Sequence, residues 1–202
     1  MRPKDVIAVG LALIVSACSI GRPIPTATTY SIEPSPAAMA IPKSPHPERL
    51  RVERVRVAAA YDRAALVYRL DAVRYISDPY HTFLADPGPM LSNRIAEWLA
   101  AAGLFKAVDA PGGSAPAPWV LETTVTELYG DFENDNPAAV MSIRFTIIDE
   151  GSARPKVAYE SSLSRRVPVS RATPEALVSG YGRALADILT QLAADLSNSA
   201  SL

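Results

Sequence analysis

The sequence predicts an α+β fold in which a mixed, largely antiparallel sheet carries two helices packed on one face. Three observations predict it: runs of alternating apolar residues open the folded part of the chain, a helical pattern interrupts them, and further strand-like runs precede a long closing helix. The 202 residues are 49% hydrophobic and 20% charged, which is typical of a globular protein. Their number favours a single domain.

Residues 1–17 have the three parts of a bacterial signal peptide. Arg2 and Lys4 precede an apolar run over residues 6–15, and small residues follow it. The apolar run is about half the roughly 20 residues that a helix needs to cross a bilayer. We therefore expect the segment to be removed rather than to remain as a membrane span.

The residues at the predicted cut, Val15-Ser16-Ala17-Cys18, resemble the bacterial lipobox. In that motif the cysteine sulfur accepts a diacylglycerol, and the peptidase cleaves in front of it. We predict cleavage between Ala17 and Cys18 and lipidation of Cys18, the only cysteine of the chain. The alternative is an ordinary secretory signal in which Cys18 happens to lie near the cut.

The lipid on Cys18 predicts where the protein resides. Two or three acyl chains, palmitate among them, anchor a protein stably, whereas one chain holds it only reversibly. In lipoproteins an aspartate after the cysteine favours retention in the inner membrane, and this chain has Ser19 there. We expect an outer-membrane lipoprotein of a Gram-negative bacterium that faces the periplasm.

Residues 18–47 are predicted to be a lipidated, proline-rich tether. Seven prolines lie between Gly21 and Pro47, and proline favours an extended chain that rises about 3.1 Å per residue. The β-forming composition of residues 28–33 predicts a first or edge strand within the tether. The single folded domain is expected over residues 48–198.

The first half of that domain is predicted to contain strands and then a helix. Apolar residues alternate over residues 50–57 with a one-residue slip, which indicates a strand with a bulge. Residues 66–77 have the pattern of a hairpin. Apolar residues at helical spacing predict a helix over residues 87–102, opened by Asp86-Pro87 and stopped by Gly103.

The second half is predicted to be an antiparallel meander closed by a helix. A short strand is expected at residues 105–108, and three longer β-rich runs follow, at residues 119–129, 140–149 and 157–167. Thr173-Pro174-Glu175 opens the last helix. We interpret Gly180 and Gly182 within that helix as positions of close packing against the sheet.

The composition excludes several classes of function. A net charge of −1 argues against a nucleic-acid surface, and one cysteine allows no internal disulfide, cysteine zinc site or iron-sulfur cluster. Neither His46 nor His81 has a second histidine at helical spacing, so surface or packing roles are expected. No metal ligands and no cofactor are predicted.

Residues 131–142 resemble a calcium-binding loop only in part. Asp131, Glu133 and Asp135 alternate as the first ligands of such a loop do, but Asn136 replaces the turn glycine and Ser142 the last glutamate. We interpret the acidic residues as a solvated hairpin turn, which we expect over residues 131–137.

No catalytic residue is predicted. The chain has no Gly-x-Ser-x-Gly motif and no glycine-rich phosphate loop, and Cys18 is used by the anchor. Tyr80, Phe83 and Leu84 lie in the segment before the first helix. They are the candidates for an exposed apolar contact with a partner, with burial in the core as the alternative.

The order of these features resembles the ABC-type transport auxiliary lipoprotein family, which includes the paraquat-inducible C lipoprotein. The resemblance covers nearly all of the mature chain. Its parts are the lipobox, the Tyr30-Ser31-Ile32 segment, Tyr61-Asp62-Arg63, Leu66-Val67-Tyr68-Arg69, Tyr75, Phe83, Pro87, Met90-Leu91, Trp119-Val120-Leu121-Glu122, Leu128-Tyr129-Gly130-Asp131-Phe132 and Ala184-Leu185. Phe83 stands where the family often has tryptophan.

The resemblance implies a non-enzymatic component of a transporter that moves lipids between the two membranes. Its implied partners are a mammalian-cell-entry (MCE) domain protein that bridges the periplasm, an ABC permease with its ATPase, the membrane, phospholipid and further copies of the chain. The lipoprotein would dock the far end of the bridge and help to hand over lipid. Two alternatives stay open: an outer-membrane assembly-factor lipoprotein, and a periplasmic enzyme of an unrecognised type.

Overall fold

The computed structural model describes residues 26–34 and 46–199. The predicted signal peptide, Ala17, Cys18 and most of the tether lie outside these residues. In chain order the described elements are β1 (Thr28–Tyr30), β2 (His46–Val52), β3 (Arg56–Val57), β4 (Ala65–Arg69), β5 (Tyr75–Phe83), α2 (Pro87–Ala102), β6 (Phe105–Asp109), β7 (Trp119–Asp131), β8 (Ala138–Asp149), β9 (Lys156–Pro168) and α3 (Pro174–Asn198).

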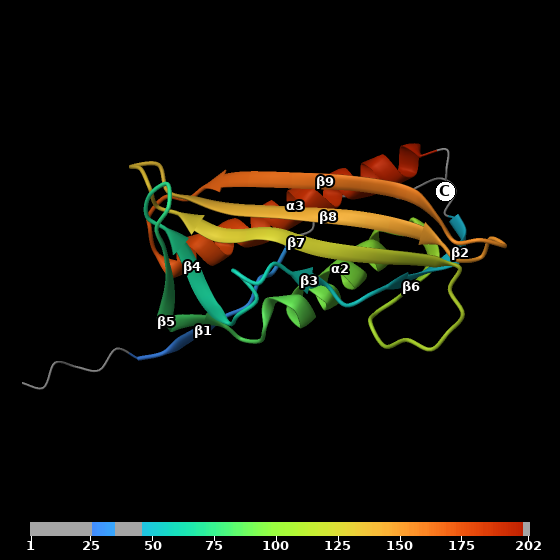
Figure 1. The fold of residues 1–202 in the computed structure, drawn as a ribbon, viewed down its shortest axis with the longest axis horizontal. Coiled ribbons are helices and arrows are strands. Elements are labelled where there is room, and N and C mark those ends of the chain that lie inside the picture. Colours follow the sequence, from blue (N-terminus) through green and yellow to red (C-terminus); the bar gives the residue numbers. More distant parts are fainter. Residues whose placement is uncertain (1–25, 35–45, 200–202) are drawn as a thin grey trace, which may run out of the picture.

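All described strands join one mixed sheet, and β7 lies at its centre. One edge of β7 pairs with the whole of β8, which pairs in turn with β9, and both ladders are antiparallel. The other edge of β7 pairs in parallel with β2, then β3, then β4. The predicted α+β class, with its two helices on one face of a mixed sheet, is confirmed (Figure 1).

The predicted strand over residues 50–57 is instead two strands, β2 and β3. The interruption lies where α2 reaches the backbone, because the N–H of Val55 donates to Ser92 Oγ at 2.9 Å. The slip in the apolar pattern therefore marks a helix contact and not a bulge. β2 also begins at His46, inside the segment that we assigned to the tether.

The segment that follows β1 belongs to the folded domain. Ile32 is completely buried in the main core, and Arg94 of α2 pairs with the Glu33 carboxylate. The strand predicted within residues 28–33 is present over its first part as β1, an edge strand parallel to β5. The stretch after it is held between the two helices.

Local signals set the limits of both helices. α2 begins at Pro87 and ends before Gly103, whose φ of 65° is the left-handed conformation that glycine adopts without strain. α3 begins after Thr173, whose side chain accepts a hydrogen bond from the Ala176 N–H at 3.3 Å. No helix of the described residues is both long and apolar enough to span a membrane.

Both glycines of α3 allow close packing, but the predicted packing against the sheet is confirmed only for Gly180, since Gly182 meets the segment after β1. A methyl group on Gly180 would lie 2.7 Å from Ala139 Cβ in β8. A methyl group on Gly182 would lie 2.5 Å from the carbonyl oxygen of Glu33. Gly182 thus holds the segment after β1 against α3.

Gly182→Ala should destabilise the protein although alanine is the better helix former. In an open helix this change stabilises by about 1 kcal/mol, but here the methyl group meets backbone and should cost about 1–3 kcal/mol. Urea denaturation measures the difference, with the exposed Asp187→Ala in the same helix as the control. A Gly182→Ala variant at least as stable as wild type would show that the segment after β1 is not packed as described.

Candidate functional site

Several chain segments meet at one end of the sheet, which we call the hairpin end. It comprises the turn between β4 and β5, the turn between β7 and β8, and the last residues of β9 (Figure 1). The register brings these together, because Arg69 of β4 lies opposite Asp131 of β7 and Ala138 of β8 lies opposite Pro168 of β9. Charged, aromatic and exposed apolar side chains gather there.

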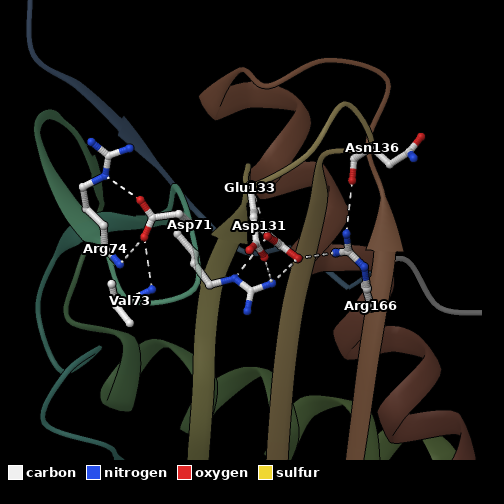
Figure 2. Close-up of polar contacts among 8 residues, drawn as sticks. Asp71, Val73, Arg74, Asp131, Glu133, Asn136 and Arg166 are labelled. Atoms are coloured by element: carbon white, nitrogen blue, oxygen red, sulfur yellow. Dashed lines mark hydrogen bonds and ion pairs between the residues drawn. The ribbon is translucent and has the colours of Figure 1, made fainter.

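The charged group at the hairpin end is centred on the buried carboxylate of Asp131. Arg69 contacts it through two nitrogens, with Nη2 at 2.8 Å and Nε at 3.2 Å, and Arg166 Nη1 lies 2.9 Å from it. Arg69 also pairs with Glu133 at 3.0 Å, and Arg166 donates to the Asn136 carbonyl (Figure 2). Three strand ends and a turn are thereby tied together.

The ionisation of this group follows from its contacts. Burial raises the pKa of the Asp131 carboxyl, but the hydrogen bonds from Arg69 and from the Glu133 N–H, with the charges of both arginines, outweigh burial and lower the pKa below its ordinary value. The hydrogen bonds with Asp131 raise the pKa of Arg69. Both groups are therefore charged at neutral pH.

The solvated acidic turn that we predicted for residues 131–137 is wrong for Asp131, which is buried. Its partners lie on strands remote in sequence, so no local spacing indicates them. Arginines contact both carboxylate oxygens of Asp131. Within residues 26–34 and 46–199, no three His, Cys, Asp or Glu side chains are placed to hold a metal ion.

Tyrosines cover the neighbouring part of the sheet on the face away from α3. Gly130 faces α3 through Leu177, so the adjacent Tyr129 points to the opposite face. The ring of Tyr61 stacks on Tyr129 at 5.9 Å between centroids, and Tyr75 meets it edge-on at 5.6 Å. With Val67 and Val140, Tyr129 forms a second, smaller core. Burial raises the pKa of Tyr61 to about 12.

The turn between β4 and β5 is held by its own side chains. Asp71 Oδ1 accepts hydrogen bonds from the N–H groups of Val73 at 3.1 Å and Arg74 at 2.8 Å, and its other oxygen pairs with Arg74 Nε at 3.1 Å (Figure 2). These contacts, the Val73 N–H foremost, lower the pKa of Asp71. The turn is thus a defined structure that presents Val73 outward.

A bulge in β5 is organised by a second aspartate. Leu66 pairs with Asp78 but Ala65 pairs with Thr82, so residues 79–81 loop out of the ladder. The Asp78 carboxylate accepts hydrogen bonds from the backbone N–H groups of Tyr80 and His81 and from Tyr68 Oη, the last at 2.9 Å. It also lies 2.7 Å from Nδ1 of His81. Burial acts to raise the pKa of Asp78, but these hydrogen bonds lower it overall.

The structure separates the three predicted contact residues. Tyr80 projects from the bulge and Leu84 is exposed beside a surface pocket of about 250 Å³ that Ser31 and Met90 also line. Phe83 is only 4% exposed and its ring lies 6.2 Å from that of Tyr181, so it belongs to the core. It cannot contact a partner, because β5 extends to this residue and turns it inward.

Exposed apolar residues that the sequence did not single out lie at the hairpin end. Val73, Tyr75 and Ile76 are 89%, 44% and 43% exposed. In the sequence they have the alternation of an ordinary strand, which does not show that they are exposed. Their exposure follows from tertiary structure alone.

Residues 30–193 match the family model described as the ABC-type transport auxiliary lipoprotein component. The chain belongs to this family. The match covers all the described elements after β1 except the last residues of α3. It confirms the resemblance found in the sequence and identifies the protein as an auxiliary lipoprotein component.

Two solved structures share the fold of this chain with TM-scores above 0.6. A Xanthomonas campestris protein of the DUF330 family superposes with a TM-score of 0.68 at 17% identity, covering 86% of this chain and 94% of the other. The structure of an uncharacterized protein superposes with a TM-score of 0.61 at 18% identity, covering 85% of this chain and 97% of the other. The PelC dodecamer from Paraburkholderia phytofirmans superposes with a TM-score of 0.44 at 18% identity, covering 77% of this chain and 92% of the other. No curated protein matches the chain in sequence.

Removing Arg69 should destabilise the auxiliary lipoprotein more than removing Arg166. Arg69→Met leaves the buried Asp131 carboxylate with Arg166 and the Glu133 N–H, and should cost about 2–3 kcal/mol, less than a fully broken buried pair. The Arg166 side chain is 46% exposed, so Arg166→Met should cost below about 1 kcal/mol. Urea denaturation at neutral pH measures both, and equal losses would contradict the central place given to Arg69.

Asp131→Asn should change how stability depends on pH. A carboxyl whose pKa is lower in the folded than in the unfolded protein stabilises the fold at pH values above its unfolded pKa of about 3.9. This stabilisation is lost as the pH falls through the pKa of the folded protein. The stability difference between wild type and Asp131→Asn should therefore be largest at neutral pH and shrink below about pH 4. Urea titrations across this range, with the exposed Asp135→Asn as control, measure it. A difference that stays constant into acid would refute the assignment.

Proposed function

We propose that this chain is a membrane-anchored periplasmic auxiliary lipoprotein of an ABC and MCE-type transport system. It acts there as a docking or hand-over component for lipid moving between the two membranes. The observation that carries the proposal is the match of residues 30–193 to the transport auxiliary lipoprotein family. The MCE partner, the phospholipid and the outer-membrane location are parts of the proposal.

The beginning of the chain supports an anchored protein. The lipobox-like sequence ends at Cys18, and the described domain begins with β1 at Thr28. A chain spans at most about 3.6 Å per residue, so these ten residues reach no further than about 36 Å. The domain would thus work close to the membrane that holds its lipid.

The polar groups of the described residues support a binding role over catalysis. The buried charges at the hairpin end neutralise one another, with both oxygens of Asp131 engaged by arginine. The Asp78 and His81 pair has the residue types of a catalytic dyad, yet Asp78 is occupied by four donors that fix the β5 bulge. These groups are used to hold the shape of a surface.

A crosslinked pull-down of the full lipoprotein from its own envelope tests the proposal. We expect recovery of an MCE-domain protein with its permease and ATPase, identified by mass spectrometry. Cys18→Ala should leave the domain folded, release it into the periplasmic fraction and reduce the recovery several-fold. Recovery of an outer-membrane assembly machine instead, or unchanged function of the released variant, would overturn the proposal.

A further inference from the structure

The hairpin tip, residues 70–76, carries three exposed large apolar side chains, those of Val73, Tyr75 and Ile76. Val73 lies at the turn and is the most exposed large apolar residue of those that the structure describes. Tyr75 and Ile76 follow in succession on β5, so they point to opposite faces of the strand. A flat partner surface would cover one of these faces, whereas a medium that surrounds the tip would cover both.

The chain enters the domain at the same end. β1 runs parallel to β5, with Thr28 opposite His81 and Tyr30 opposite Phe83. The beginning of β1 therefore lies beside the bulge of β5. It lies at the same end of the domain as the hairpin tip, since both are at the left in Figure 1. Nine residues separate Cys18 from Thr28 in the sequence, so the predicted lipid site is close along the chain to this end of the domain.

The charges around the tip do not require an acidic partner. Arg74 is paired with Asp71, and Arg69 is paired with Asp131 and Glu133. Arg63 donates to the Ser77 hydroxyl at 3.3 Å. Tyrosine and arginine beside exposed aliphatic residues are the composition that favours the boundary between lipid headgroups and acyl chains.

We propose that the hairpin tip inserts into the headgroup layer of the membrane that holds the lipidated Cys18, and so sets the orientation of the domain. This rests on the anchor of the proposed function. Anchoring raises the effective concentration of the tip at the bilayer, so a contact of three apolar side chains suffices. The rigid Asp71 turn lowers the entropic cost of that contact. The opposite end of the sheet then faces the periplasm, where a transport partner would meet it.

A fluorescent label on the tip tests this directly. Because Cys18 carries the lipid, Val73→Cys provides the one free thiol for an environment-sensitive dye in the full lipidated protein. Val157→Cys is the matched control, since Val157 is 59% exposed and is the second residue of β9, at the opposite end of the sheet. Both proteins are reconstituted in phosphatidylethanolamine and phosphatidylglycerol vesicles, and circular dichroism verifies their fold.

We expect emission from the Val73 position to shift to shorter wavelength and to be lost when a quencher confined to the bilayer is added. The Val157 position should show neither effect, and added salt should change neither result. If both labels report water while the protein still floats with the vesicles, the tip does not contact the membrane and the proposal is overturned, although the anchor is retained. Protein that fails to float would refute the anchor itself. Shielding that arises only at high protein density would indicate a second copy as the occupant and would also overturn the proposal.

Discussion

The architecture depends on the pairing of β7 along both of its edges. One edge holds β8 over its full length, and the other holds three short strands one after another. Strands as short as β3 have too few hydrogen bonds to be stable alone. Because a single long strand is the partner of all three, their positions are fixed relative to one another and to both helices. The hairpin end is assembled where this strand ends.

At the hairpin end, buried ion pairs hold the strands together, whereas apolar packing does so in the main core. Asp131 is buried at the last pair of β7, where β4 and β9 both present arginines. A buried carboxylate is costly alone, so the three groups are stable only when the strands have the correct register. The group thereby selects one alignment of strand ends. The smaller core around Tyr129 closes the other face beside it.

Local features of the sequence were sufficient for much of the fold. Pro87 and Gly103 mark the limits of α2 because proline opens a helix and glycine accepts a positive φ at its end. The long strands β7 to β9 show in the alternation of their residues. The parallel partners of β7 could not be predicted, since a two-residue strand carries no information about what it pairs with. Asp131 was misread for the same reason, because Arg69 and Arg166 are its neighbours only in space.

The candidate surface was predicted less well than the fold. Phe83 was a contact candidate because it precedes α2, yet its place at the end of β5 buries it against Tyr181. Val73 was overlooked because a valine in a hairpin is ordinary, and its exposure depends on the Asp71 turn that holds it outward. Such surfaces depend on which apolar residues the tertiary structure leaves uncovered.

The packing of the segment after β1 has a mechanical consequence. A force applied through the residues before Thr28 and along β1 loads its hydrogen bonds to β5 in shear, so they resist together rather than opening one at a time. Ile32 lies beyond them in the core, and Glu33 is held between Gly182 and Arg94. Tension on the residues before β1 is therefore transmitted into the interior of the domain, and a pull at this end does not begin by peeling β1 from the sheet.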